Sequence, residues 1–475
     1  MRDLLKTLRK KIIAFIALLL IIPLIVGIIY AQKQLPNGVS VDGALHADSD
    51  VRFVYDLTYD NNGRVMEHHL YDEMLQIIEE AEHTLVIDMF LYNDDYDRSK
   101  GDYPARANDI TNAVLAALKD NPELNVTIIT DAINTVYGST MPENFSKLQD
   151  ASAEVIFTNM EPLPDSNPVY SSVWRTYLQW CPTSQNGFLP NAFNPDGAKA
   201  SFGSYFDMLN FKANHRKVVL NEQQALVTSA NITHDGSSYH SNIGFVVTGA
   251  ILEDLYASEQ AVAKLSNITL EDVEWNYQNE VSDIQTKIVT EGKIKETMLA
   301  MLGDADANSE INIGVFYLAD RDVVKAIKKA AKAGATVQVI VDPNKDAFGL
   351  EKNGIPNRQV AAELEKSGAT VRFYDTQGEQ YHSKFLYVKS GDQAALLGGS
   401  ANFTRRNIAD YNLETNLYMT MPATSELATT VEAYFERLWQ NENGQYTVDF
   451  EVYEDQARWK KVFYRIQEAT GLSTF

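Results

Sequence analysis

Two short segments of the chain carry the same chemically useful side chains in the same order. Each has a histidine and a lysine two residues apart, followed by a serine and an asparagine that are also two residues apart. The first set is His215, Lys217, Ser229 and Asn231, and the second is His382, Lys384, Ser400 and Asn402. One His-x-Lys alone would be weak evidence for a site. Because the whole set occurs twice, it predicts an internal duplication that builds one active site from two half-sites.

Side chains of these types suit phosphodiester chemistry. A phosphodiester anion repels nucleophiles, so its site needs donors for the non-bridging oxygens, a usable nucleophile and an acid for the leaving alkoxide. The lysines, asparagines and serines supply the donors. Imidazole has an ordinary pKa of about 6.5, so one histidine can act as a neutral nucleophile and the other as a protonated acid. We therefore expect neither a metal nor another cofactor.

Extended strands followed by hairpins would position these groups. Side chains two residues apart on a strand share a face, so His215 and Lys217 form one unit, as do His382 and Lys384. A turn follows each strand, at residues 221–224 and 389–393. The apolar strand that returns from each turn brings the serine and asparagine back beside the histidine.

Four further residues complete the predicted site. Glu414 is expected to hold a ring nitrogen of one histidine, as orienting carboxylates do in other nucleophilic sites. Asn242 has the equivalent spacing in the first half, and it can orient a ring without adding negative charge. This asymmetry is expected to separate the pKa values of the two histidines. Arg405 and Arg406 follow the second asparagine directly and are predicted to bind a lipid phosphate, the alternative being that they only solvate a loop.

The elements around the motifs are also repeated. The order strand, helix, strand, His-x-Lys strand occurs twice: at 84–92, 110–118 and 125–131 before the first motif, and at 310–318, 322–333 and 336–342 before the second. Alternating strands and helices predict an α/β fold of two similar halves, each a mainly parallel sheet flanked by helices.

With these motifs the chain resembles the phospholipase D superfamily, whose signature is His-x-Lys-x4-Asp followed by a Gly/Ser-x-x-Asn segment, present twice. The resemblance covers about residues 50–475, and segment 398–407 with Glu414 resembles the cardiolipin synthase and phosphatidyltransferase branch. It implies a covalent phosphohistidine intermediate that water or an alcohol resolves without a metal. It also implies that His215 attacks, while His382 serves as acid and then as base.

The chain departs from this signature at two positions. Glu222 stands where the superfamily has Asp, and Lys389 stands where the second motif has Asp, which reverses the charge. Both lie at predicted turns, so we interpret them as structural. If Lys389 lined the site instead, the second half would be impaired.

The amino terminus predicts a membrane anchor. Residues 12–30 carry no charge and at about 1.5 Å per residue are long enough to cross a hydrocarbon core of about 30 Å. Basic residues in 1–11 outnumber those just after the span, which predicts a single-pass cell-membrane protein with a cytoplasmic N-terminus and an extracytoplasmic body. A cleaved signal peptide is the alternative.

The predicted organisation has five parts: a basic head at 1–11, the transmembrane anchor at 12–30, a linker at 31–48, a first half at 49–285 and a second half at 286–475. Residues 160–212 differ most between the halves and are rich in Pro, Gly, Asn and aromatic residues. This segment is either an insertion packed on its own half or a lid or access path for an amphiphile.

The composition of the chain limits the functions that it could have. The chain has 475 residues and a net charge of −23, which opposes nucleic-acid binding, and its single cysteine excludes an intrachain disulfide. The sequence predicts a membrane-anchored phosphatidyltransferase or phospholipase D that uses a phospholipid and a water or alcohol acceptor, with cardiolipin synthesis among its candidate reactions. The alternatives are a nuclease or other phosphodiesterase, and a non-catalytic lipid-binding relative.

Overall fold

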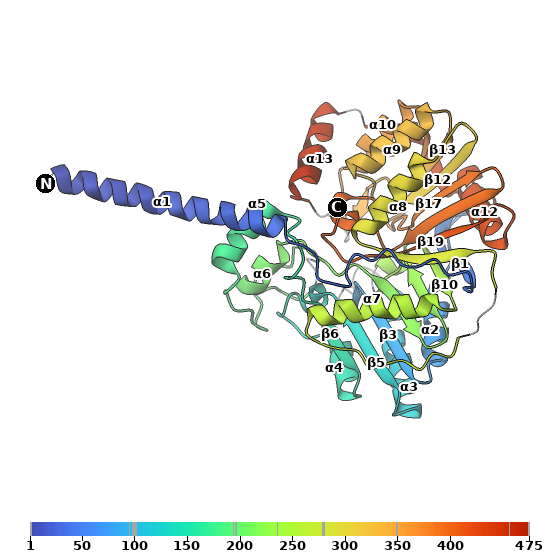
Figure 1. The fold of residues 1–475 in the computed structure, drawn as a ribbon, viewed down its shortest axis with the longest axis horizontal. Coiled ribbons are helices and arrows are strands. Elements are labelled where there is room, and N and C mark those ends of the chain that lie inside the picture. The colour runs from blue at the N-terminus through green and yellow to red at the C-terminus, as the bar shows by residue number, and fades with distance from the viewer. Residues whose placement is uncertain are drawn as a thin grey trace.

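The computed structural model describes residues 2–94, 96, 102–192, 194, 197–234, 236–277, 281–347, 350–455 and 457–473. Its body has two α/β halves, each built on an eight-stranded sheet with helices packed on it, and a long apolar helix, α1 (Arg2–Ala31), projects from the body (Figure 1). The predicted fold class, two similar α/β halves with one N-terminal apolar helix, is confirmed.

The sheet of the first half has the order β2-β1-β10-β8-β7-β3-β5-β6. Its strands are β1 (Val51–Asp60), β2 (Arg64–Glu67), β3 (Thr84–Met89), β5 (Asn125–Thr130), β6 (Glu154–Phe157), β7 (Lys217–Asn221), β8 (Ala225–Thr228) and β10 (Asn242–Val247). The long helices of this half are α2 (Leu70–Glu79), α3 (Arg106–Asp120), α4 (Glu143–Asp150) and α7 (Ile251–Leu265). Neighbouring residues of β3 belong to different clusters, Val86 to the one that contains α7 and Ile87 to the one that contains α2 and α3. Helices therefore cover both faces of this sheet.

The sheet of the second half has the order β11-β19-β18-β17-β12-β13-β16-β20. Its strands are β11 (Gln285–Thr290), β12 (Ser309–Val315), β13 (Thr336–Val341), β16 (Thr370–Tyr374), β17 (Lys384–Ser390), β18 (Gln393–Gly399), β19 (Thr415–Pro422) and β20 (Thr447–Asp449). Its long helices are α8 (Gly292–Gly303), α9 (Arg321–Lys332), α10 (Asn357–Glu365) and α12 (Glu426–Gln440).

Shorter elements complete the described chain. Two small sheets pair β4 (Tyr92–Asn93) with β9 (Ile232–Thr233) and β14 (Asp346–Ala347) with β15 (Leu350–Glu351). The remaining helices are η2 (Ala132–Thr135), α5 (Pro168–Val173), the π-helix η3 (Trp174–Leu178), α6 (Phe202–Met208), η4 (Gly236–Tyr239), α11 (Arg405–Ile408), η5 (Phe450–Val452) and α13 (Arg458–Thr470).

The predicted strand direction was wrong. Within the two large sheets, parallel pairing joins β3-β5-β6 and β12-β13-β16, and the other neighbours are antiparallel. The reason lies in the motif strands themselves, because β7 and β8, like β17 and β18, are joined by tight turns that allow only a hairpin.

The two halves share a hydrophobic core. One cluster contains residues of β1, β10 and α7 together with residues of β18, β19 and α12. Phe53 packs its ring 5.6 Å from Phe245 of its own half and 5.2 Å from Tyr434 of the other half. A Cβ on Gly398 would lie 2.7 Å from the ring of Phe245, so the sheets approach closely where this glycine lies. This packing brings the two motif hairpins toward one another.

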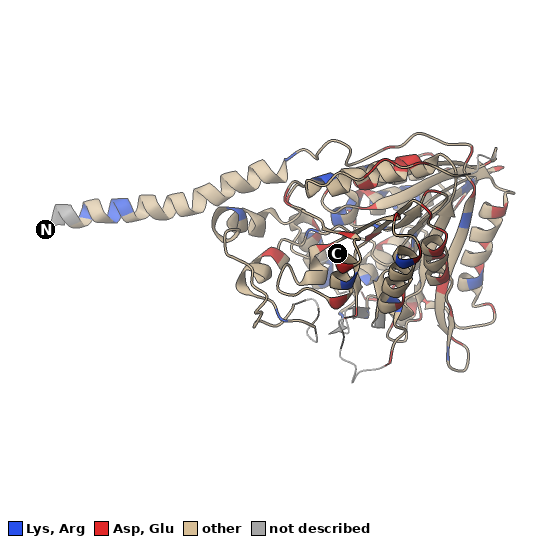
Figure 2. Cartoon of the chain, turned by 90° about the horizontal axis from the view of Figure 1, so that it is seen from below, with Lys and Arg blue, Asp and Glu red and all other residues tan. Residues whose placement is uncertain are grey.

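The helix α1 meets the composition test for a membrane span. The most apolar stretch of 18 residues within Leu5–Ala31 has a mean hydropathy of 3.3 and is 11% buried, a test that a signal sequence would also pass. Lysine and arginine are confined to the free end of α1, whereas both signs of charge cover the body (Figure 2). The residues after α1 do not hang free, because Gly43 and His46 donate backbone hydrogen bonds to Ile288 and Thr286 on β11.

Candidate active site

Each motif histidine is held by the other half of the molecule. The backbone N–H of His215 donates to Leu413 O (2.9 Å), and that of His382 donates to Ser241 O (2.8 Å). The Nδ1 of His215 lies 2.8 Å from a carboxylate oxygen of Glu414, and the Nδ1 of His382 lies 3.0 Å from Asn242 Oδ1. These acceptors place the ring proton on Nδ1 and leave Nε2 of the neutral ring with a lone pair. The structure thus brings both motifs together where the halves meet.

The lysines and two phenylalanines frame the histidines in the same way twice. Lys217 Nζ donates to the carbonyl oxygen of His215 (2.8 Å), and Lys384 Nζ donates to that of His382 (2.5 Å). Phe90 packs 4.7 Å from the ring of His215, at the end of β3. Phe316 occupies the equivalent place at the end of β12, 5.2 Å from His382. The sequence analysis did not identify these phenylalanines as site residues, although each lies within a strand that it predicted, 84–92 or 310–318.

The motif serines fix the orienting groups. Ser400 Oγ donates to Glu414 (2.5 Å) and accepts from Thr415 N–H (3.0 Å). Ser229 Oγ donates to Asn242 Oδ1 (3.1 Å) and accepts from Ile243 N–H (2.9 Å). Asn407 adds a third donor to Glu414. The serines therefore act on the histidines through the orienting residues.

The side chains of the motif asparagines each have an oxygen atom without a hydrogen-bond partner among the described residues. These atoms are the buried Oδ1 atoms of Asn231 and Asn402. Buried polar atoms normally find partners, so the unpaired amide oxygen is an exception that the two half-sites share.

Burial lowers the pKa of all four motif side chains. The pKa of His215 falls to about 4, chiefly because the ring is buried, and the charge of Glu414 opposes this shift. Burial and the neighbouring charge of Lys384 lower the pKa of His382 well below its ordinary value. Burial lowers the pKa of Lys217 to about 7 and, together with Lys217, that of Lys384 well below the ordinary value. An entering phosphate anion would oppose each of these shifts.

Two further pairs of equivalent residues support the site. Asp131 and Asp342 directly follow the equivalent strands β5 and β13. Each accepts the N–H of the residue before the motif histidine, Asn214 at 2.7 Å and Tyr381 at 2.9 Å. Burial raises the pKa of Asp131 to about 7. The sequence showed that the two aspartates occupy equivalent places, but not which backbone they hold.

His240 and Asn412 form the second pair. His240 Nδ1 accepts from Gln380 N–H (3.1 Å), and Asn412 Oδ1 accepts from Ala213 N–H (3.2 Å). His240 also lies 5.6 Å from the ring of His382, and burial lowers its pKa to about 3. His240 lies two residues before Asn242, just as Asn412 lies two residues before Glu414. This equivalent spacing is the sequence signal that could have identified His240.

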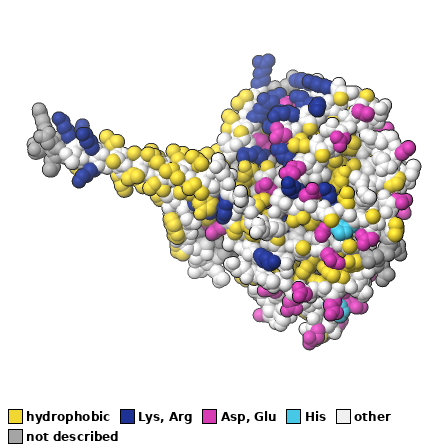
Figure 3. Space-filling model, in the orientation of Figure 1, with side chains coloured by type: hydrophobic (Ala, Val, Ile, Leu, Met, Phe, Trp, Pro, Cys, Tyr) yellow, Lys and Arg dark blue, Asp and Glu magenta, His cyan; other side chains and the backbone are white. Residues whose placement is uncertain are grey.

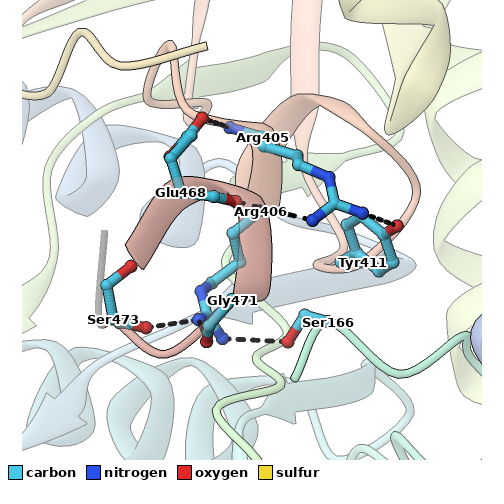
Figure 4. Close-up of a pocket in the computed structure, with 7 residues that line it drawn as sticks. All are labelled: Ser166, Arg405, Arg406, Tyr411, Glu468, Gly471 and Ser473. Atoms are coloured by element: carbon cyan, nitrogen blue, oxygen red, sulfur yellow. Dashed lines mark hydrogen bonds between the residues drawn. The ribbon is translucent and has the colours of Figure 1, made fainter. Parts of the chain in front are cut away.

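Arg405 and Arg406 lie against the carboxy-terminal helix α13. Arg406 donates to Ser166 Oγ (2.9 Å) and to the carbonyl oxygens of Gly471 and Ser473, and Arg405 donates to Tyr411 and to the backbone at the end of α13 (Figure 4). They line a small pocket with these partners. The structure therefore does not group them with the histidines, and their predicted role in binding lipid phosphate stays a prediction.

The two departures from the signature occupy structural positions. Glu222 is fully buried and accepts the backbone N–H groups of residues 82, 83 and 84 at the start of β3. Lys389 lies on β17, not in the turn, and pairs with Glu432 at 3.1 Å.

Across the described ranges, no cluster of three or more His, Cys, Asp or Glu residues is arranged to hold a metal ion.

Known proteins resemble the chain at two levels. Residues 298–439 match a family described as cardiolipin synthase, PLD-like domain, and this range includes His382, Lys384, Asn402 and Glu414. No curated protein matches the sequence. Among solved structures, phosphatidylserine synthase from Haemophilus influenzae Rd KW20 is 12% identical, with 89% of this chain and 94% of that chain covered and a TM-score of 0.56.

Two other solved structures align less closely. Polyphosphate kinase from Porphyromonas gingivalis is 11% identical, covering 89% of this chain and 53% of its own, with a TM-score of 0.47. The phospholipase D family member Nuc from Salmonella typhimurium is 17% identical, covering 34% and 97%, with a TM-score of 0.26. At this level of identity, the likeness to the synthase shows a shared fold, and TM-scores below 0.5 add nothing further.

Proposed function

We propose, from its membership of the phospholipase D superfamily and the cardiolipin synthase-like sequence of its second half, that this chain transfers phosphatidyl groups between alcohols or to water. The observation that carries the proposal is the reciprocal support of the two histidines. His215 depends on Glu414 of the second half, and His382 depends on Asn242 of the first half. One phosphorus atom between the two rings would then meet a nucleophile on one side and an acid on the other.

The first step would form a phosphohistidine. Nε2 of neutral His215 attacks phosphorus, a P–N bond forms, and the P–O bond to the leaving alcohol breaks. His382, protonated once the phosphodiester occupies the site, gives its proton to the departing oxygen. Lys217, Lys384 and the asparagine amides stabilise the charge that develops on the non-bridging oxygens.

The second step would reverse the proton transfer. Neutral His382 takes a proton from water or from an alcohol, whose oxygen attacks phosphorus and displaces His215. Water would yield phosphatidic acid, glycerol would yield phosphatidylglycerol, and the free hydroxyl of a second phosphatidylglycerol would yield cardiolipin. Which acceptor prevails depends on access to the intermediate.

The asymmetry of the orienting groups supports the assignment of roles. The Glu414 carboxylate stabilises the positive charge that His215 acquires as its Nε2 forms a bond to phosphorus. Asn242 orients His382 without stabilising its cation, so His382 releases its proton more readily. A better nucleophile and a stronger acid follow from this single difference in charge.

The apolar helix α1 supports a membrane location for the enzyme, with its basic end in the cytoplasm and the body on the opposite side. A phospholipid substrate fits this location, since an anchored body meets lipid continuously. The net charge of −23 opposes recruitment by anionic lipids, so the anchor would do the recruiting.

The test uses the full-length protein in vesicles that contain phosphatidylglycerol labelled in its acyl chains, with and without added alcohol. We expect labelled cardiolipin, phosphatidic acid or the phosphatidyl ester of the added alcohol from the wild type. The variant His215→Ala should form none of them, and acid-labile label on the wild-type protein should reveal the phosphohistidine.

Two results would overturn the proposal. Turnover of a single-stranded oligonucleotide but not of lipid would favour a nuclease. Lipid binding without any turnover that depends on His215 would favour a non-catalytic lipid-binding protein.

A further inference from the structure

A helical segment of the body packs lengthwise against the apolar helix α1. It consists of α5, the π-helix η3 and the residues up to Trp180, and we refer to residues 168–180 as the companion segment. A Cβ on Gly27 would lie 2.9 Å from Ser172 Cβ, so this small residue permits close approach. Farther along α1, the hydroxyl of Tyr177 donates to the carbonyl oxygen of Leu19 (2.9 Å). Figure 1 shows α5 beside the end of α1 that joins the body.

The contact at Leu19 sets the depth of the companion segment in a membrane. At about 1.5 Å per residue, Leu19 lies about 18 Å along the helix from Ala31. A hydrocarbon core is about 30 Å thick, so a span formed by residues 12–30 places Leu19 well inside it. Whatever touches this carbonyl must itself enter the bilayer.

The outward face of the companion segment is apolar. Its exposed side chains recur at helical spacing, with exposed fractions of 61% for Val169, 40% for Val173, 39% for Tyr177 and 70% for Trp180. Figure 3 shows hydrophobic side chains continuing from α1 onto the adjoining surface of the body. An exposed apolar stripe of this size on a water-facing loop would be unfavourable, whereas acyl chains would cover it.

Polar groups of the segment are satisfied internally, as a hydrocarbon environment demands. Arg175 is buried against Asp165 (2.8 Å), and its guanidinium lies 3.8 Å from the ring centroid of Tyr30, near the end of α1. Trp174 donates its indole N–H to Asp207 (2.8 Å), and Thr176 donates to Ser172 O (2.7 Å). The exposed stripe is thus left with almost no unpaired polar group.

We propose that the companion segment dips into the bilayer leaflet next to the body, with Val169, Val173, Tyr177 and Trp180 in contact with lipid acyl chains. The proposal rests on α1 being the membrane anchor. It makes the body a partly embedded enzyme, not one tethered above the surface. Helix α13, which lies on the side of the body from which α1 leaves (Figure 1), exposes the apolar side chains of Trp459, Val462 and Phe463.

The test measures lipid contact at single labelled positions in the full-length protein. The chain has one cysteine, so Cys181→Ser provides a background for Val169→Cys, labelled with an environment-sensitive fluorophore and reconstituted in phosphatidylcholine vesicles. The matched control is Val452→Cys, because Val452 is 60% exposed in η5 of the second half. A second control, Leu24→Cys, reports on the anchor itself.

We expect nitroxide-bearing lipid to quench most of the fluorescence at positions 169 and 24, and aqueous iodide to quench position 452. Quenching of position 169 by iodide, with position 24 still quenched by lipid, would overturn the inference while leaving the anchor intact. Protection of position 169 from both quenchers would overturn it in favour of a second copy of the chain. Quenching of position 24 by iodide would overturn the anchor and the inference together. None of these readouts depends on catalytic turnover.

Discussion

The half that supplies His215 and the half that supplies His382 have the same arrangement of strands, but the residues that orient the two histidines differ in charge. His215 faces the carboxylate of Glu414, whereas His382 faces the amide of Asn242, at nearly equal distances. Burial lowers the pKa of both rings, but only at His215 does an orienting carboxylate oppose the shift. A duplicated scaffold can therefore give two identical side chains different roles by changing one residue that touches each of them.

A second difference lies behind the motif strands. Arg216 points away from the site and is fully buried between Glu291 (2.8 Å) and Glu259 (3.3 Å). The equivalent residue is Ser383, whose hydroxyl forms a hydrogen bond with that of Tyr434 (3.1 Å) in place of an ion pair. Glu291 belongs to the second half and also accepts the backbone N–H of Glu414 (3.0 Å), so its ion pair with Arg216 joins the two halves behind the orienting residue.

The largest expected effect separates the two histidines by role. His215→Asn should lower the phosphodiesterase rate by about 10⁴-fold or more, because it removes the nucleophile. His382→Asn should be equally impaired with an alkyl leaving group but recover partly with 4-nitrophenolate, which needs no acid. Rates on both substrate types check this assignment. Partial recovery in the His215→Asn variant instead would reverse the roles.

The next effect concerns stability. Arg216→Met leaves two buried carboxylates without their cation and should lower the free energy of unfolding by about 3–5 kcal/mol. Ser383→Ala, the matched change in the other half, should cost about 1 kcal/mol. Urea unfolding followed by circular dichroism measures both values. Equal costs would show that the buried ion pair does not distinguish the halves.

Exchange of the orienting groups should alter catalysis without unfolding the chain. Glu414→Gln keeps the shape of the side chain but removes the negative charge beside His215. We expect a 10- to 100-fold loss in kcat. Asn242→Asp should raise the pKa of His382 and shift the alkaline limb of the pH profile of kcat/KM upward, because His382 must be protonated in the first step. Steady-state rates between pH 5 and 9 would record both effects. An unchanged profile in Asn242→Asp would argue against His382 as the proton carrier.

The depressed pKa of His215 predicts a pH dependence of stability. Its folded value of about 4 lies below the ordinary value of 6.5, so the unfolded chain binds the extra proton first as the pH falls. The wild type should lose on the order of 3 kcal/mol from this group between pH 7 and pH 4, and only a few tenths of a kcal/mol more below that. In His215→Gln this part of the loss should vanish. Urea midpoints at both pH values give the comparison, and an equal loss in the two proteins would refute it.

The smallest effect tests the departures from the signature. Lys389→Ala removes a half-exposed ion pair with Glu432 and should change the free energy of unfolding by less than about 1 kcal/mol, with activity preserved. Glu222→Gln should cost about 1–3 kcal/mol, because it weakens buried hydrogen bonds to the start of β3. Thermal unfolding and phosphodiesterase assays measure both. A large loss of activity in Lys389→Ala would place this lysine in the catalytic site.

The sequence by itself determined the duplication, the α/β class and the orienting pair of Glu414 and Asn242. These features depend on residue type and on periodicity within one segment of the chain. Alternation of side chains defines the face of a strand, and the length of an apolar run defines α1. The phenylalanines beside the histidines could not be read in this way, because Phe90 and Phe316 resemble any other residue that ends a buried strand.

Only the tertiary structure decided which groups meet. Strand direction came from hairpin pairing across the sheet, the partners of Arg406 came from helix α13, and the companion segment found α1 across more than a hundred residues of chain. Contacts between residues far apart in sequence leave no periodic trace, since they depend on the packing of whole sheets. The same reason explains why each histidine could be identified from its own segment, while its dependence on the opposite half could not.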